Sequence, residues 1–181
     1  SHLILISEYL EFENQSLSID VSLHIGSFLA VIIYFSNDLI NFFKNKIIFY
    51  KILLSSLPVM IVGFFLVEFD IINKIRNIET IAWTTLIFGI LLFISDKFKA
   101  EKNIYNDFNY KSVFLIGFMQ ILSLVPGVSR SGIAITAARL LKFKRAEAAK
   151  ISFLISIPIL GAVSIFGLKN LLLSDNAEFT K

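Results

Sequence analysis

Cysteine is absent from the 181 residues, and only 17% of them are charged. Without cysteine, these residues can form no disulfide bond, thiolate metal site or cysteine nucleophile. The charged fraction is low for a soluble domain, which usually carries about 25% Asp, Glu, Lys and Arg. The sequence also lacks a Gly-x4-Gly-Lys-Ser/Thr loop, which argues against a P-loop ATPase. The composition therefore points away from soluble thiol-dependent and P-loop enzymes.

Hydrophobic residues make up 56% of the chain, with 19 phenylalanines and a mean hydropathy of +0.76. They form long blocks separated by polar segments, the pattern of an integral membrane protein. The net charge of +3 is small, and the basic residues cluster between the apolar blocks. Such a distribution suits membrane orientation better than nucleic-acid binding. We therefore expect an all-α integral membrane protein, a multi-span helical bundle forming a single transmembrane domain over residues 1–181, without a nucleic-acid partner.

Four apolar blocks are predicted to cross the bilayer, at residues 17–35, 52–67, 80–95 and 148–173. Pro58 lies in the second block, where neighbouring helices can satisfy the carbonyl group that it frees. The remaining segments are predicted to be connections: an amphipathic connector over 37–51, a mixed-charge loop over 68–79, a solvated loop over 96–111 and a polar tail over 174–181.

Two shorter apolar segments, residues 112–125 and 133–141, lie between the third and fourth blocks. Each is too short to cross a bilayer alone, because a spanning helix needs about 20 apolar residues. Pro126 and Gly127 end the first segment, since proline lacks an amide donor and glycine tolerates positive φ. Helix, break, polar tip and helix together predict a re-entrant hairpin, whose tip carries Arg130 into the membrane.

The tip residues Ser129, Arg130 and Ser131 are typical of a phosphate site. They lie at the start of the returning helix, where free backbone amides and the helix dipole favour an anion. The Arg130 guanidinium can donate a planar pair of hydrogen bonds to phosphate oxygens. The alternative is a kinked membrane helix in which Arg130 pairs with a backbone carbonyl. Because arginine at this depth costs at least about 2.5 kcal/mol, we favour the functional interpretation.

The basic residues of the connections are unequally distributed if each spanning helix changes sides and the hairpin returns to the side it left. One side then holds only Lys74, Arg76 and Lys169. The other side, which we predict to be cytoplasmic, holds eleven basic residues, namely Lys44, Lys46, Lys51, Lys97, Lys99, Lys102, Lys111, Lys142, Lys144, Arg145 and Lys150. A helix crossing at 112–141 would move residues 142–150 to the opposite side and remove the asymmetry.

Residues 1–10 resemble residues 131–140 in their order of polar and apolar positions, and each segment precedes a polar turn and a long apolar block. Two such copies that enter from opposite faces are expected of inverted-topology repeats. Residues 1–10 would then be the returning half of a second re-entrant hairpin. Because the chain begins with Ser1 rather than Met, we expect it to be a fragment.

The strongest motif lies in residues 117–132, where a helix bearing Gln120 leads into Pro126-Gly-Val-Ser-Arg-Ser-Gly132. Together with residues 1–5, 20–31 and 153–162, this motif resembles the undecaprenyl-diphosphatase family of the bacitracin-resistance type. The resemblance extends over essentially all 181 residues. It implies that the chain lacks the glutamates and the Ser-Ser pair of the family's first motif, and also the family's C-terminal helices.

The resemblance implies a membrane phosphatase that converts undecaprenyl diphosphate into undecaprenyl phosphate and inorganic phosphate, recycling the carrier lipid of cell-wall synthesis. It implies a divalent metal, Mg²⁺ or Ca²⁺, whose ligands it does not identify here. It also implies a multi-pass protein of the bacterial inner membrane, with two re-entrant hairpins and an active site toward the periplasm. The implied partners are an isoprenyl diphosphate lipid and membrane lipids, and a homo-oligomer stays open. We do not expect these residues alone to be fully active.

By position, the resemblance assigns catalytic roles to His2, Ser129 and Arg130. His2 matches the histidine that ends the first motif and is the candidate for proton transfer. Without the match, a solvated histidine near the chain end is an equal alternative. Ser129 and Arg130 match the second motif, with Ser129 as a phosphate donor or an alternative nucleophile.

Phosphate binding is expected from the whole tip, that is, from Gly127, Ser129, Arg130, Ser131 and Gly132. We expect Gly127 to let the backbone approach the diphosphate closely. Gln120 and Ser123 are expected to order the tip, with structural packing as the alternative.

Two other functions remain open from the sequence. Inverted repeats and broken helices are also typical of secondary transporters, so a transporter or lipid flippase is the main alternative. A non-catalytic structural membrane subunit is the other. A different lipid-phosphatase pattern, which places a histidine six residues after Ser-Arg, does not fit because Thr136 occupies that position.

Overall fold

A computed structural model describes residues 17–36, 39–40, 45–69 and 77–178. These residues form helices and no strand, with one isolated β-bridge between Lys102 and Phe143. In chain order the helices are α2 (Leu17–Tyr34), α4 (Lys46–Glu68), α6 (Ile78–Asp96), α7 (Ile104–Asp107), α8 (Tyr110–Ile121), the short 3-10 helix η1 (Leu122–Leu124), α9 (Arg130–Leu140) and α10 (Arg145–Glu178). The all-α prediction is confirmed.

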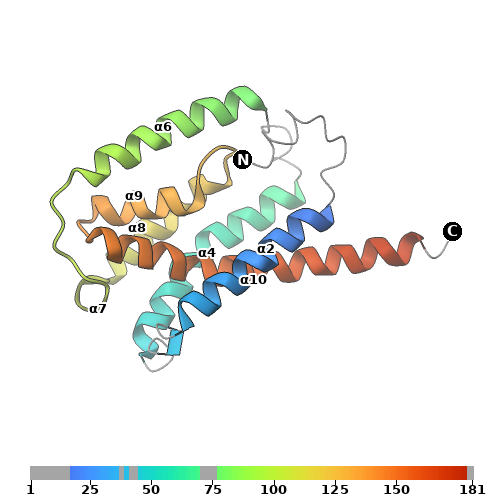
Figure 1. Cartoon of the computed structure of the whole chain (residues 1–181), viewed down its shortest axis with the longest axis horizontal. Helices are drawn as coiled ribbons and strands as arrows, with labels where there is room; N and C mark the ends of the chain where they lie inside the picture. The colour runs from blue at the N-terminus through green and yellow to red at the C-terminus, as the bar shows by residue number, and fades with distance from the viewer. Residues whose placement is uncertain (1–16, 37–38, 41–44, 70–76, 179–181) are drawn as a thin grey trace.

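Helix α10 is the longest element and contacts α2, α4 and α9 (Figure 1). Helices α2 and α4 both pack against α10, whereas α9 lies between α10 and α6. Helix α8 packs against both α4 and α9, so the α8–η1–α9 hairpin is enclosed by α4, α6 and α10. An irregular backbone inside a membrane needs such protein surroundings.

Three helices are long and apolar enough to cross a membrane: Lys46–Glu68, Ile78–Asp96 and Arg145–Lys169. They correspond to the second, third and fourth predicted spans. In the first predicted span, the shorter apolar helix Ser22–Tyr34 is found. On α6 most large apolar side chains are exposed, Phe93 at 63% for example, as expected for a surface that faces lipid.

Asparagine side chains cap three of the helices and so determine where these begin. Asn45, Asn77 and Asn109 accept hydrogen bonds from backbone amides three residues later, at 3.5, 2.7 and 2.9 Å respectively. Such a cap satisfies an amide that has no partner within its helix. Because Asn45 caps α4, the helix starts at Lys46, and the prediction of a connector through residue 51 is wrong for residues 46–51.

The segment predicted as a solvated loop over 96–111 is partly buried. It contains α7, and its Ile104 and Phe108 are 1% and 2% exposed. The Phe108 ring packs edge-on against that of Phe143, with centroids 6.2 Å apart. Ile104 and Phe108 thus belong to the hydrophobic core. The segment therefore packs against the bundle instead of extending into solvent. The polar tail predicted from residue 174 is likewise helical to Glu178, where α10 ends.

Candidate functional site

The chain turns at the predicted position, between α8 and α9. Helix α8 tightens into η1, and the Val125 amide then bonds the Leu122 carbonyl at 3.1 Å. The Val128 amide bonds the Val125 carbonyl at 3.1 Å, which closes a turn around Pro126 and Gly127. Gly127 adopts a φ of +94°, a conformation that residues with a side chain rarely adopt. The helix–break–helix prediction is confirmed.

Gly127 also packs directly against α6. A Cβ atom at this position would collide with Thr84 Oγ1 and would lie only 2.7 Å from the Ile81 carbonyl oxygen. The space that a side chain would need is therefore filled by α6. The structure thus gives the glycine a packing role against this helix, whereas its expected approach to a diphosphate stays a prediction.

Ser129 is the N-cap of α9. Its hydroxyl accepts a hydrogen bond from the Gly132 amide at 3.1 Å and lies 3.3 Å from the Ser131 hydroxyl. A Cβ atom on Gly132 would lie 3.0 Å from Ser129 Cβ, so a residue without a side chain suits the capped turn. Because its amide already bonds Ser129, Gly132 contributes to the tip through the cap.

Arg130 and Ser131 are the first two residues of α9. The amides of the first helical residues have no acceptor within their own helix, so both can donate to a bound anion. Ser129 and Ser131 are exposed and Arg130 is half-buried. Within the described part of the chain, the Arg130 guanidinium forms no hydrogen bond or ion pair. The alternative of a structural arginine paired with a carbonyl therefore finds no support there.

The tip is held by side chains of neighbouring helices that the sequence analysis did not single out. Thr84 and Thr85 of α6 donate hydrogen bonds to the carbonyls of Pro126 and Gly127, at 2.6 and 3.1 Å. From α10, the buried Ser152 hydroxyl lies 3.3 Å from the Ser131 carbonyl. Hydroxyl residues inside apolar blocks were the available signal, but their partners are 21 to 42 residues away in sequence.

These contacts also show how deep the tip lies. Thr84 is separated from Asp96, the end of α6, by twelve residues, or about 18 Å along the helix axis. The whole of α6 is about 28 Å long by the same measure. The hairpin therefore enters beside the Asp96 end of α6 and reaches about two thirds of the way along the helix.

The supporting residues Gln120 and Ser123 lie before the break. Gln120 is 1% exposed, and its side-chain oxygen has no hydrogen-bond partner among the described residues. Ser123 lies half-buried within η1. A role of these two residues in ordering the tip stays a prediction, with structural packing as the alternative.

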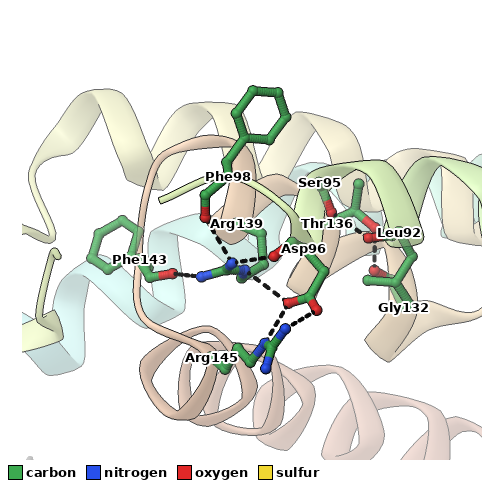
Figure 2. A network of polar contacts seen from close by, with 9 residues as sticks. All are labelled: Leu92, Ser95, Asp96, Phe98, Gly132, Thr136, Arg139, Phe143 and Arg145. Carbon is green, nitrogen blue, oxygen red and sulfur yellow. Dashed lines mark hydrogen bonds and ion pairs between the residues drawn. The ribbon is translucent and has the colours of Figure 1, made fainter. Parts of the chain in front are cut away.

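A second arginine, Arg139, holds the base of the hairpin (Figure 2). It is 4% exposed and donates hydrogen bonds to the carbonyls of Phe143, Asp96 and Phe98, at 2.9, 2.6 and 2.9 Å. Its Nε lies 3.2 Å from Asp96 Oδ1, close enough for an ion pair although not aligned as a hydrogen bond. Arg145 forms two further bonds to the same carboxylate, at 2.8 and 2.6 Å. Arg139 was missed in the sequence because its partners belong to distant segments.

Two of the expected site components cannot be located. His2 lies outside the described residues, as does the proposed repeat formed by residues 1–10. No group of three or more His, Asp or Glu side chains suited to a metal ion occurs in the part of the chain that the structure describes. The tip itself offers a guanidinium and hydroxyls, and hence no carboxylate ligand.

Comparison with known proteins bears directly on this site. The family described as Bacitracin resistance protein BacA matches residues 1–180. A protein of Pelagibacter ubique (strain HTCC1062) named undecaprenyl-diphosphatase is 44% identical to the chain over 171 residues. The matched region covers 94% of this chain and 67% of that protein. The hairpin tip lies within the region matched by the family.

Proposed function

The chain belongs to the bacitracin resistance protein family, and from this premise we propose that it acts in hydrolysing undecaprenyl diphosphate. The reaction consumes one water molecule, breaks the phosphoanhydride bond, and yields undecaprenyl phosphate and inorganic phosphate. The name of the Pelagibacter relative supports this substrate. One observation carries the proposal. Arg130 has no hydrogen-bond or ion-pair partner among the described residues, and it lies at the start of α9, the helix that Ser129 caps after the break in the hairpin.

Phosphoanhydride hydrolysis depends mostly on positioning and on charge stabilisation. Arg130 supplies a positive charge and a bidentate donor for the non-bridging oxygens of the diphosphate. The amides of Arg130 and Ser131 add two further donors at the N-terminus of α9. Because hydrogen-bond donors that are already oriented need no reorganisation during the reaction, they stabilise the charge that develops on the phosphate oxygens.

Ser129 acts as a phosphate ligand in this proposal. One lone pair of its oxygen is engaged by the Gly132 amide, while its proton remains available to Ser131 or to a phosphate oxygen. This arrangement favours a donor over a nucleophile, because the amide hydrogen bond draws electron density from the oxygen, whereas the hydroxyl proton is free to be donated. We retain His2 as the proton-transfer group on the basis of the family resemblance.

A divalent metal ion, Mg²⁺ or Ca²⁺, is retained as a proposal on the family resemblance alone. The described residues do not form a suitable ligand set, and the guanidinium at the tip repels cations. When bound, such an ion would neutralise phosphate charge. The roles of Arg130 and of the α9 amides given above do not depend on it.

We also propose that the protein resides in the bacterial inner membrane with its active site toward the periplasm. The three long apolar helices support a membrane location. The base of the hairpin lies with the basic segments around Lys102 and Lys142, and basic segments are retained on the cytoplasmic side. A tip that reaches two thirds of the way across from there would be closer to the periplasmic face.

The decisive experiment removes the positive charge of Arg130. We expect Arg130→Ala in the full-length gene product, reconstituted in lipid vesicles, to lower phosphate release from undecaprenyl diphosphate by about 100-fold or more. The matched control is Arg145→Ala, since this exposed arginine lies at the other end of the hairpin and should leave kcat unchanged. Hydrolysis that survives Arg130→Ala, with lipid movement across the vesicle blocked, would favour the transporter alternative.

A further inference from the structure

The carbonyl groups of the hairpin tip need partners that the tip itself does not provide. A backbone carbonyl left without a hydrogen bond at membrane depth costs several kcal/mol. The Pro126 and Gly127 carbonyls receive hydrogen bonds from Thr84 and Thr85, and from no other donor among the described residues. These two residues, here called the α6 threonine pair, therefore satisfy the unwound backbone.

The proton of the Thr84 hydroxyl has a preferred acceptor. Thr84 Oγ1 lies 2.6 Å from the Thr80 carbonyl, 3.2 Å from that of Ile81 and 2.6 Å from that of Pro126. A hydroxyl can donate only one proton at a time. The Thr80 and Ile81 carbonyls already accept amides within α6, whereas the Pro126 carbonyl has no other donor among the described residues. The hydrogen bond to the Pro126 carbonyl is therefore the most stabilising of the three, because it satisfies a group that has no other donor.

Fixing these carbonyls also determines where the neighbouring amides point. In a planar trans peptide, the amide hydrogen and the carbonyl oxygen point in opposite directions, and the described chain contains no cis peptide bond. With the Pro126 carbonyl directed at α6, the Gly127 amide points away from α6. Gly127 therefore becomes a third backbone donor of the tip, beside the free amides of Arg130 and Ser131.

We propose that Thr84 and Thr85 are positioning residues for the diphosphate site. By holding the Pro126 and Gly127 carbonyls against α6, they keep the backbone donors of the tip oriented toward the phosphate groups of the substrate. This inference rests on the proposed function of the tip. It adds α6, whose residues carry none of the family motif, to the elements on which catalysis depends.

The test is the double variant Thr84→Val/Thr85→Val, in which each hydroxyl is replaced by a methyl group of similar size. In the reconstituted full-length protein, we expect kcat for undecaprenyl diphosphate to fall by about 10- to 100-fold, because misplaced donors weaken transition-state binding. We expect KM to change by less than about twofold. Thr84→Ser/Thr85→Ser keeps both hydroxyls and should restore kcat.

The matched control is Thr80→Val, the same chemical change one turn earlier on α6. The Thr80 hydroxyl makes no hydrogen bond among the described residues, so kcat should stay at the parent value. If the double variant does not fold, the single variant Thr84→Val answers the question, since Thr84 holds the Pro126 carbonyl and with it the Gly127 amide. Melting temperatures within a few degrees of the parent are expected for the serine variants and for Thr80→Val.

Three results would overturn the inference: kcat retained in the double valine variant, an equal loss in Thr80→Val, or failure of the serine variants to restore kcat. If any of these occurs while Arg130→Ala is inactive, the proposed function stands and only the role of the α6 threonine pair is wrong. If the parent protein releases no phosphate, the proposed function fails first, and this inference fails with it.

Discussion

At the scale of single residues, each residue of the hairpin tip has a distinct task. Gly127 has a φ of +94°, and atoms of α6 occupy the space that a side chain at this position would need. Ser129 joins two tasks, since it caps α9 and lies exposed beside Arg130. Arg130 differs from Arg139 in having no partner in the described part of the chain. Arg130 is therefore available to bind a ligand, whereas Arg139 stabilises the fold.

Replacing Gly127 by alanine should destabilise the protein by about 2 to 4 kcal/mol, because the positive φ is strained and the added Cβ collides with α6. The matched control is Gly89→Ala, since Gly89 lies within α6 and a Cβ there would meet nothing within 4 Å. This control should be neutral or stabilising by up to about 1 kcal/mol. Denaturant titration in detergent micelles measures both changes, and equal stability of the two variants would contradict the packing role of Gly127.

At the scale of elements, the hairpin is fastened at both ends to helices distant in sequence. Its tip is bonded to α6 by Thr84 and Thr85. Its base is bonded to the end of α6 by Arg139, which satisfies three backbone carbonyls at once. Both helices of the hairpin also bury apolar side chains, for example Val113 and Ile133, against the surrounding helices. The polar connections add fixed attachment points at the tip and at the base.

Replacing Arg139 by methionine should cost about 3 to 5 kcal/mol of unfolding free energy, because three backbone carbonyls lose their donor and the Asp96 carboxylate loses a neighbouring positive charge. Arg145→Met should have a much smaller effect, since the Arg145 side chain is 76% exposed and its bonds to Asp96 compete with water. The ratio of the two changes, measured in the same micelles, checks the assignment. Comparable losses would show that the buried bonds to the backbone are not the source of the stability.

At the scale of the whole molecule, the polar contacts gather the basic segments at one end of the bundle. Lys51 donates to the Phe108 carbonyl at 2.6 Å, which joins the start of α4 to the segment before α8. The amides of Glu101 and Lys102 both bond the Lys142 carbonyl, at 3.1 and 3.0 Å. The hairpin therefore returns to the side that it left, as the distribution of lysines and arginines indicated.

Because these residues contain no cysteine, single cysteines can report on which side each segment lies. Cysteines placed at Lys99 and Lys142 should both be protected from a membrane-impermeant maleimide added to intact cells. A cysteine at Glu68, at the other end of α4, should be labelled. Labelling at position 142 but not at 99 would mean that the hairpin crosses the membrane.

Much of the architecture follows from the sequence because its physical causes are local. The bilayer requires about 20 apolar residues per spanning helix, and the blocks containing Pro58, Trp83 and Ile155 are long enough to be found by composition. The break at Pro126 and Gly127 follows from their backbone chemistry. Arg130 was singled out because a charge inside an apolar region is costly, and the sequence therefore predicts a function for it.

What only the tertiary structure decided is which distant residues support that break. Ile104 and Phe108 are surrounded by polar residues in sequence, and they are buried because they join a core cluster that also contains Phe143. Thr84 and Thr85 resemble ordinary members of an apolar helix until the carbonyls of the tip are placed beside them. A local pattern reports the conformation that a segment prefers. The partners of a buried donor or acceptor depend instead on how whole helices pack, which no short stretch of sequence encodes.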